Sequence, residues 1–390
     1  SFGGEKDGLI KTAMEIVHQR YPDYARRVKS AFGSGRMKAL RALSAKAFEG
    51  APVPTQPAWH SAPVGEPTDR AGYRAGPEKR FLSLNKMVID WHTIRGQAPQ
   101  RDPDLVSIIV CVFNQYSLTN KCLNALARHC GRAKVEFIMV NNGSDEETSG
   151  LLDSWAERDG RVTVIHNFDN LNFSLGNNIG FAASQGARVV FLNNDTEVKA
   201  GWMEPLLAPL ADPDVKGTQP KLLYPDGRLQ CMGVVFSGKT PLGYPIYVDE
   251  AADSPLVAQN RRFRAITGAC FAMRATDFAA VGGFDPVFIN GQEDIDLCYR
   301  VGHGANVFEY VAASTVTHHE GRTKGRGRFI THNRYSYAAR WNDVFPGDDV
   351  DHYAKDGFIV AEYQIDRPEL DGKSIACWRA KIEAVASIDA

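Results

Sequence analysis

Four short apolar runs recur between residues 106 and 192, and polar residues follow most of them directly. Three of the runs are Val106–Phe113, Val135–Val140 and Val162–Ile165, and the fourth stops at Leu192, just before Asn193. Near-continuous apolar runs of this length are typical of strands buried on both faces of a parallel sheet. Such sheets bind their ligands where the strands end.

Segments with apolar residues at helical spacing separate the runs. Leu118, Cys122 and Leu126 lie four residues apart, and a short helix is expected over residues 176–186. This alternation predicts an α/β fold with a mostly parallel, Rossmann-like sheet flanked by helices. Frequent Pro and Gly predict irregular or antiparallel structure over residues 217–268. A further helix is expected near residues 373–386.

A change of composition near residue 100 divides the chain. Residues 8–48 are basic and helix-prone, whereas residues 50–77 are rich in Pro, Gly and Ala, as linkers are. We predict three parts: an N-terminal helical extension with its linker over residues 1–100, a main domain over 101–345, and a C-terminal extension over 346–390.

Charge and cysteine content exclude several classes of protein. The net charge of −1 gives no reason to expect nucleic-acid binding. The seven cysteines are an odd number without a Cys-x-x-Cys pair, which argues against a disulfide framework or a zinc site and favours a reducing compartment. No apolar run approaches the ~20 residues of a spanning helix, and no export signal is evident. We therefore expect a cytoplasmic protein.

Asp195 follows the fourth run directly, so a rigid strand would deliver its carboxylate to the ligand-binding edge of the sheet. Magnesium and manganese prefer oxygen ligands, and often take only one or two carboxylates when substrate phosphates fill the remaining positions. Asp195 is therefore a candidate metal ligand. The alternative is a carboxylate that only caps a helix or forms a turn.

A second acidic cluster begins a predicted helix about a hundred residues later. Ile295, Cys298 and Val301 lie three apart, which places Glu293 and Asp294 in the first turn. The helix dipole favours ionised carboxylates there, and an ionised carboxylate can act as a general base. The alternative is that both residues only cap the helix. Asp296 and Arg300 have the spacing of a surface ion pair.

A third feature combines histidine with a basic, glycine-rich segment. Thr317-His318-His319-Glu320-Gly321 precedes Arg322 and Lys324. A histidine can complete a metal site, and a flexible basic loop can close over a diphosphate. The alternative is one buried histidine beside a solvated loop.

Taken together, the order and spacing of these features resemble family 2 of the inverting glycosyltransferases, which have the A-type nucleotide-sugar-binding fold. The resemblance covers residues 104–341. It is carried by Val106–Asn114, Val140–Ser144, Asn177–Gly180, Asn193–Asp195, Thr267–Phe271, Val281–Asp285, Glu293–Cys298 and His318–Gly321.

The resemblance implies a role for each matching residue. Asp294 matches the base that deprotonates the acceptor hydroxyl, with Glu293 positioning the acceptor. Asp195 and His318, or His319 as its neighbour, match the ligands of a divalent metal, Mn²⁺ or Mg²⁺. The remaining matches would contact the nucleotide-sugar donor: Phe113, Asn114, Asn142, Asn178, Asn193, Asn194, Arg322 and Lys324.

Two departures affect the expected donor. Asn193 replaces a common first aspartate of the metal motif, and the nucleoside turn reads Asn141-Asn142-Gly143-Ser144 where an aspartate pair is common. Both variants are familiar in rhamnosyltransferase-like members, which implies a dTDP- or UDP-sugar. The expected reaction is metal-dependent, inverting transfer to a hydroxyl of a glycan or lipid-linked glycan.

Two other functions remain open at this point. A non-catalytic carbohydrate-binding or scaffolding module could share the fold, and so could a nucleotidyltransferase, although no Gly-rich basic loop follows the first run. Residues 1–100 are expected to dock on the main domain or a partner protein, or alternatively to contact a membrane surface or the acceptor. Contact with the inner face of the membrane would make the protein peripheral.

Overall fold

The computed structural model describes residues 101–130, 134–319, 329–342, 344–366 and 374–385. The four apolar runs form neighbouring parallel strands in the order β3-β2-β1-β4. Their bounds are β1 Asp102–Val112, β2 Val135–Asn142, β3 Val162–Asn167 and β4 Gly186–Asn193. All four predicted strands are confirmed; the apolar runs of β1, β2 and β4 are largely buried, whereas β3 lies at the edge of the sheet and leaves Thr163 exposed.

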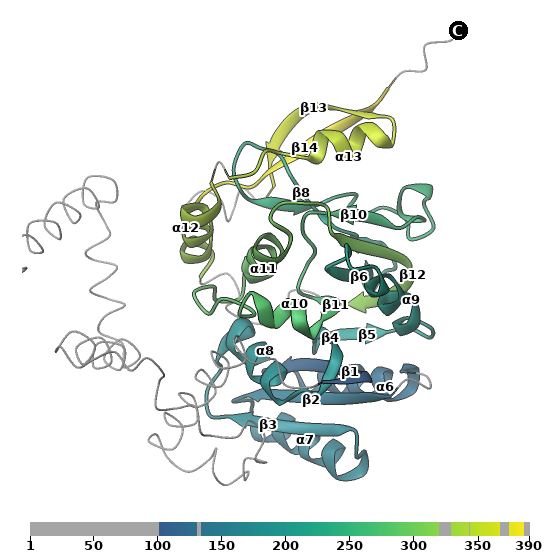
Figure 1. Cartoon of the computed structure of the whole chain (residues 1–390), viewed down its shortest axis with the longest axis vertical. Helices are drawn as coiled ribbons and strands as arrows, with labels where there is room; N and C mark the ends of the chain where they lie inside the picture. The colour runs from purple at the N-terminus through teal and green to yellow at the C-terminus, as the bar shows by residue number, and fades with distance from the viewer. Residues whose placement is uncertain (1–100, 131–133, 320–328, 343, 367–373, 386–390) are drawn as a thin grey trace, which may run out of the picture. The chain divides into compact units, whose positions relative to one another are not determined.

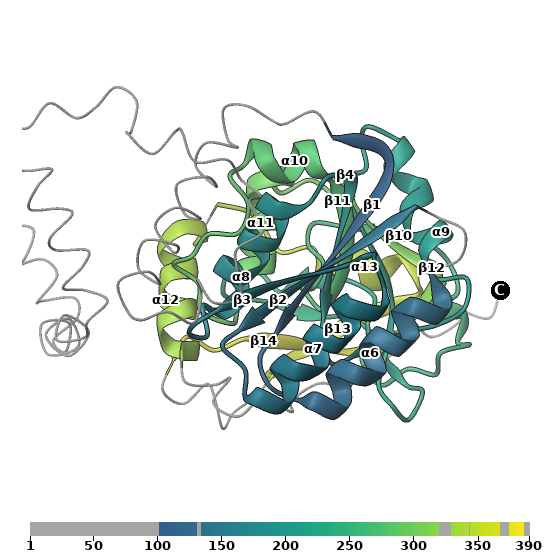
Figure 2. The ribbon, with the colours of Figure 1, turned by 90° about the horizontal axis from the view of Figure 1, so that it is seen from below.

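Two apolar cores cover the two faces of this sheet because successive strand residues point in opposite directions. Ile108 and Val110 belong to the core that includes residues of α6 (Tyr116–His129) and α7 (Glu146–Arg158). Ile109 belongs to the other core, with residues of α8 (Asn172–Ala183), α10 (Ala275–Ala280) and α11 (Glu293–Gly302). Figure 2 shows α6 and α7 on one side of the strands and α8, α10 and α11 on the other.

The predicted third helix is real, but its bounds differ from the expectation of residues 176–186. α8 begins at Asn172, which has a positive φ of 64°, and ends at Ala183, so Gly186 already belongs to β4. The helix packs tightly on the sheet through Gly180. A Cβ atom at that position would lie 2.4 Å from Cγ2 of Ile109.

The second half of the sheet adds strands of both directions. β11 (Cys270–Arg274) runs antiparallel between β4 and β6 (Gly217–Leu223), and β12 (Phe308–His318) runs parallel to β6. Short antiparallel strands complete the region: β5 Thr196–Val198, β7 Leu229–Cys231, β8 Val234–Phe236, β9 Gly243–Pro245 and β10 Arg261–Phe263. The expectation for residues 217–268 is confirmed except for the parallel pairing of β6.

The strand directions bring several polar termini to one place. β1, β2, β3, β4, β6 and β12 all run the same way, so their last residues share one edge of the sheet, which we call the carboxyl edge. Asn142 ends β2, Asn193 ends β4 and His318 ends β12. The sequence order of strands turns back between β1 and β4, which is where ligands bind in open α/β sheets.

The C-terminal part carries one correction. After α9 (Met203–Leu207), α10 and α11, the chain forms α12 (Ile330–Trp341), α13 (Asp349–Lys355) and an antiparallel ribbon of β13 (Phe358–Ile365) and β14 (Trp378–Ala384), seen near β8 in Figure 1. The helix predicted near residues 373–386 is therefore wrong. Trp378, Ala380 and Ile382 alternate with polar residues, which is the period of a strand.

The α/β fold class with a mostly parallel sheet flanked by helices is confirmed. The predicted helical extension over residues 1–100 lies outside the described residues. Within the described part of the chain, no helix combines the length and the apolar character needed to cross a membrane.

Candidate active site

The aspartate after β4 and the histidine that ends β12 meet at the carboxyl edge. β5 begins one residue after Asp195 and pairs with β12, so that His318 lies opposite Thr196. This pairing brings Nε2 of His318 to 3.2 Å from Oδ1 of Asp195. Both residues are buried, with exposures of 3% and 9%. The structure thus joins two residues that are more than a hundred positions apart in the sequence.

The structure separates the two neighbouring histidines. The ring of His319 bonds Glu197, with 2.6 Å between Nε2 and Oε1, while its main-chain amide donates to the carbonyl of Asp195. Successive residues of an extended chain point to opposite sides, so only His318 presents its ring to the Asp195 carboxylate. Of the two candidates, His318 is the one whose ring lies beside Asp195, and its role as a metal ligand stays a prediction.

The donor atoms of this pair suit a divalent cation. A carboxylate oxygen and an imidazole nitrogen are both accepted by manganese and magnesium. Among the residues that the structure describes, no group of three or more His, Cys, Asp or Glu could hold a metal ion.

The acidic cluster lies at the start of α11, as predicted. Gln292 precedes the helix with a positive φ of 73°, and the Glu293 carboxylate accepts a hydrogen bond from the amide of Gly291. Asp294 accepts from two main-chain amides, those of Gly268 at 2.8 Å and its own neighbour Ile295 at 2.9 Å. Hydrogen bonds from amides favour the ionised form of a carboxylate, as does the start of a helix.

A short turn links this cluster to the Asp195–His318 pair. Gly268 holds Asp294, and the next residue, Ala269, accepts a hydrogen bond of 2.9 Å from the amide of Asn193 at the end of β4. The Gly268–Ala269 turn thereby places Asp294 at the carboxyl edge. The candidate base Asp294 and the candidate metal pair therefore lie at the same edge of one sheet.

Asp296 is a correction to the sequence analysis. It does pair with Arg300, but it is fully buried instead of lying on the surface. Its carboxylate also accepts hydrogen bonds from Arg340, at 2.6 Å, and from the indole of Trp341, at 2.9 Å. This network ties α11 to α12, which explains why a charged residue is tolerated there.

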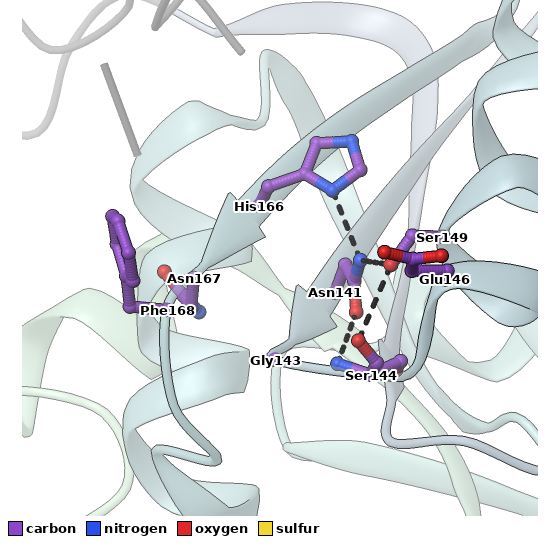
Figure 3. Close-up of a pocket in the computed structure, with 8 residues that line it drawn as sticks. All are labelled: Asn141, Gly143, Ser144, Glu146, Ser149, His166, Asn167 and Phe168. Carbon is purple, nitrogen blue, oxygen red and sulfur yellow. Dashed lines mark hydrogen bonds between the residues drawn. The ribbon is translucent and has the colours of Figure 1, made fainter. Parts of the chain in front are cut away.

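The expected nucleoside turn lines a cavity of about 270 Å³ between the ends of β2 and β3 (Figure 3). Its lining residues are Asn141, Gly143, Ser144, Glu146, Ser149, His166, Asn167 and Phe168. Asn142 is not among them. The side-chain amide of Asn142 is buried: it donates to the carbonyl of Asn172 and accepts a hydrogen bond from Asn167. These contacts link β2 to α8 and β3. The predicted contact of Asn142 with the base of the nucleotide stays a prediction.

The loop after β1 is tied to this turn. The amide of Asn114 donates to Ser144 Oγ at 2.9 Å, and Asn114 Oδ1 accepts from the amide of Asp145 at 2.8 Å. Asn194 reaches the same loop, with its Nδ2 3.5 Å from the carbonyl of Asn114, and it also donates to Thr119 Oγ1 in α6 at 2.9 Å. The structure therefore gathers Asn114 and Asn194 beside the cavity-forming turn, and Phe113 directly precedes Asn114.

Three residues predicted to contact the nucleotide-sugar donor, Asn178, Arg322 and Lys324, are not found beside this turn in the described structure. The amide of Asn178 is buried and bonds both the N–H and the carbonyl of Phe284, which gives it a structural role between α8 and the residues before α11. Arg322 and Lys324 lie outside the described residues. Donor contacts by these three residues stay predictions.

Gln230 was missed by the sequence analysis. Its side chain lies 2.7 Å from Nδ1 of His318, although the two residues are 88 positions apart. No motif surrounds Gln230, and only the pairing of β7 with β6 brings it to the carboxyl edge. An isolated glutamine in an irregular segment gives no sequence signal for such a contact.

Comparisons with known proteins agree with this geometry. The family described as Glycosyl transferase family 2 matches residues 107–229. The chain is 30% identical over 237 residues to uncharacterized protein y4gI of Sinorhizobium fredii, covering 59% of this chain and 26% of that protein. It is 29% identical over 256 residues to O-antigen biosynthesis protein RfbC of Myxococcus xanthus, covering 63% of this chain and 20% of that protein.

The chain thus spans about a quarter or less of the length of these curated relatives. Among solved structures it is similar to GalNAc-T7 with UDP, GalNAc and Mn²⁺, at a TM-score of 0.49 and 18% identity over 75% of this chain and 65% of that one. The strand arrangement, the polar carboxyl edge and the family match agree with one another. Residues 107–229 match the family described as Glycosyl transferase family 2, and the described residues form an α/β fold with a mostly parallel sheet.

Proposed function

We propose that this chain transfers a sugar from a nucleoside-diphosphate donor to a hydroxyl group of an acceptor, with inversion at the anomeric carbon. The observation that carries the proposal is the Gly268–Ala269 turn, which holds the Asp294 carboxylate at the same edge as Asp195 and His318. A base and a diphosphate-binding pair must lie on one edge for a single displacement.

In the proposed reaction the acceptor oxygen loses its proton to Asp294 and bonds to the anomeric carbon. The bond from that carbon to the diphosphate oxygen breaks, and the nucleoside diphosphate leaves from the opposite face. The two amides that bond Asp294 fix the orientation of its carboxylate before the proton arrives. Glu293, which precedes the base at the start of α11, would position the acceptor.

Asp195 and His318 would hold a divalent metal, Mn²⁺ or Mg²⁺, through Oδ1 and Nε2. When bound, the ion neutralises charge that develops on the leaving diphosphate. Arg322 and Lys324 are proposed to add positive charge to the same group. The loop that contains Asn114 and the turn at Ser144 would enclose the nucleoside.

The donor is proposed to be a dTDP- or UDP-sugar, and the acceptor a glycan or a lipid-linked glycan. The acceptor proposal is supported by the relative RfbC, whose name assigns it to O-antigen biosynthesis. The division of the chain at residues 100 and 345, a cytoplasmic location, and a partner or membrane contact through residues 1–100 belong to the proposal as predictions.

Thermal unfolding with nucleotides tests this function. The protein is heated with UDP, dTDP or GDP, each with and without Mn²⁺, and the variants Asp195→Asn and Asp277→Asn are treated alike. Asp277 lies in α10 and pairs with Arg274, away from the carboxyl edge, so it serves as the control. A ligand at a hundred times its dissociation constant stabilises the folded state by about 2.7 kcal/mol.

We expect a metal-dependent shift with UDP or dTDP that is lost in Asp195→Asn and kept in Asp277→Asn. Absence of a shift with every nucleotide would contradict donor binding and favour a non-catalytic module of this fold. A shift of equal size without Mn²⁺ would contradict the metal role of Asp195.

A further inference from the structure

Two amide side chains contact the ring of His318 from opposite sides. Gln230 Oε1 lies 2.7 Å from Nδ1, and Asn193 Nδ2 lies 3.4 Å from Nε2. Gln230 and His318 are both buried, with exposures of 6% and 3%. A buried ring with a polar neighbour at each nitrogen has few ways to distribute its proton.

The chemistry of the two amides favours the same tautomer. A neutral imidazole has one N–H donor and one nitrogen that accepts. The carbonyl oxygen of Gln230 can only accept, so its hydrogen bond with the ring requires the proton on Nδ1. The NH₂ group of Asn193 can only donate, so its contact with Nε2 requires the lone pair on that nitrogen.

This tautomer directs the Nε2 lone pair toward Asp195. Nε2 lies 3.2 Å from Oδ1 of that carboxylate, so two electron-pair donors face each other at the carboxyl edge. A cation between them would convert this unfavourable contact into shared coordination. The arrangement fits the second layer of a metal site, where the other ring nitrogen of a ligating histidine donates to an oxygen.

Gln230 is well placed to fix the ring because its strand is held from both sides. β7 pairs with β6 through Leu222 and Cys231, and Leu229 exchanges main-chain hydrogen bonds of 2.8 Å with Asp249 and Glu250. The side chain of Gln230 thus projects from a backbone that is held at both neighbouring residues, Leu229 and Cys231. A side chain on such a support loses little further freedom when it orients a neighbour.

We propose that Gln230 is a positioning residue, which holds His318 in the Nδ1–H tautomer so that Nε2 is available to the cation shared with Asp195. The inference rests on the proposed function for the identity of the bound cation. Gln230 itself contacts neither the cation nor the donor.

Histidine tautomers in the metal-free protein test the hydrogen bond directly. Long-range ¹H–¹⁵N spectra of ¹⁵N-histidine-labelled protein at pH 8 would be recorded for wild type, Gln230→Leu, Gln230→Glu and the control Gln364→Leu, whose side chain is exposed on β13. We expect Nδ1–H at His318 in wild type and in Gln364→Leu, and its loss in Gln230→Leu. Gln230→Glu keeps an acceptor oxygen and should restore Nδ1–H.

Mn²⁺ affinity gives the second readout. Electron paramagnetic resonance would measure free Mn²⁺ in titrations with UDP and with dTDP. We expect Gln230→Leu to bind Mn²⁺ about 10–100-fold more weakly than wild type, with Gln364→Leu unchanged. Circular dichroism would establish that each variant is folded.

The outcomes separate the inference from the proposed function. A wild-type ring protonated at Nε2, or an unchanged tautomer and Mn²⁺ affinity in Gln230→Leu, would overturn the role of Gln230. The expected tautomers combined with no Mn²⁺ binding by wild type would support the orienting hydrogen bond and overturn the proposed metal site.

Discussion

The main-chain amide of Gly268 donates a hydrogen bond to the Asp294 carboxylate across 2.8 Å. Gly268 precedes β11, whereas Asp294 lies in the first turn of α11, so the bond joins the sheet to the helix that carries the proposed base. A Cβ atom at residue 268 would lie 3.4 Å from Cβ of Asp294 and 3.1 Å from Cζ of Phe173. A side chain at residue 268 would therefore crowd the ring of Phe173, whereas its contact with Asp294 would have an ordinary length.

Replacing the proposed base should abolish most turnover. Asp294→Asn keeps the shape of the side chain and an oxygen that can accept from Gly268, but it cannot take up a proton as a carboxylate does. Loss of a general base costs about 10²–10⁴-fold in rate. We expect a fall in kcat of that size in a sugar-transfer assay, with nucleotide affinity nearly unchanged. Asp277→Asn is the control, and near-normal turnover in Asp294→Asn would exclude Asp294 as the base.

The buried Asp296 should contribute strongly to stability. Asp296→Ala removes the common partner of Arg300, Arg340 and Trp341. Breaking a buried ion pair from one side costs about 3–5 kcal/mol, and we expect a loss at the lower end because Arg340 keeps Asp285. Urea unfolding measures the change. Asp226→Ala breaks an exposed pair with Arg228 and should have a much smaller effect on stability, because solvent screens such pairs.

Two helical glycines should respond to alanine with opposite signs. At Gly180 in α8 a Cβ would meet Ile109 at 2.4 Å and Val140 at 3.0 Å, whereas at Gly150 in α7 no atom lies within 4 Å. Overpacking costs about 1–3 kcal/mol, and relief of a helical glycine gains about 0.5–1 kcal/mol. We expect a lower urea midpoint for Gly180→Ala and a higher one for Gly150→Ala. A higher urea midpoint for both Gly180→Ala and Gly150→Ala would contradict the close packing of α8 on the sheet.

Asp348 should make stability fall as pH rises through mildly acidic values. Burial raises its pKa to about 6 from the ordinary value of 3.8. At pH values between 3.8 and about 6, the carboxyl group of Asp348 keeps its proton in the folded protein but has lost it in the unfolded chain. The contribution of Asp348 to the free energy of unfolding is therefore largest at the lower pH values. The difference in unfolding free energy between wild type and Asp348→Asn should therefore decrease from pH 4.5 to pH 6.5. An increase would show that Asp348 is ionised when folded.

His352, one turn further along, should show the opposite dependence. Burial lowers its pKa to about 4 from 6.5, so between these values the unfolded chain binds a proton that the folded protein excludes. Stability from this group rises with pH in that window. The difference in unfolding free energy between wild type and His352→Gln, measured by urea unfolding, should increase from pH 4.5 to pH 6.5. A flat difference would place the ring in contact with solvent.

The parts of the structure that could be predicted are those with local sequence signals. The first four strands could be predicted because each contains a short apolar run, and α11 because Ile295 and Cys298 share a helix face. The sequence predicts a helix where β14 forms, although Trp378, Ala380 and Ile382 alternate, because the partner strand β13 lies in a weakly patterned segment.

The contacts within the candidate site depend on residues distant in sequence. The burial of Asp296 follows from Arg340 and Trp341, which α12 brings from more than forty positions away. The preference for His318 over His319 follows from the pairing of β5 with β12. The sequence contains these residues but not the register of the strands that decides which of them meet.

The position of β12 has a consequence for the order in which the protein can be made. β3, β2, β1 and β4 are contiguous in the chain, so this half of the sheet can pair while synthesis continues. β12 joins its parallel partner β6 from about ninety residues further on, and long-range parallel pairing is slow because a large loop must close first. In a nascent chain that has not yet added β12, Asp195 therefore lacks His318 beside it. The proposed metal pair forms only when β12 pairs with the sheet.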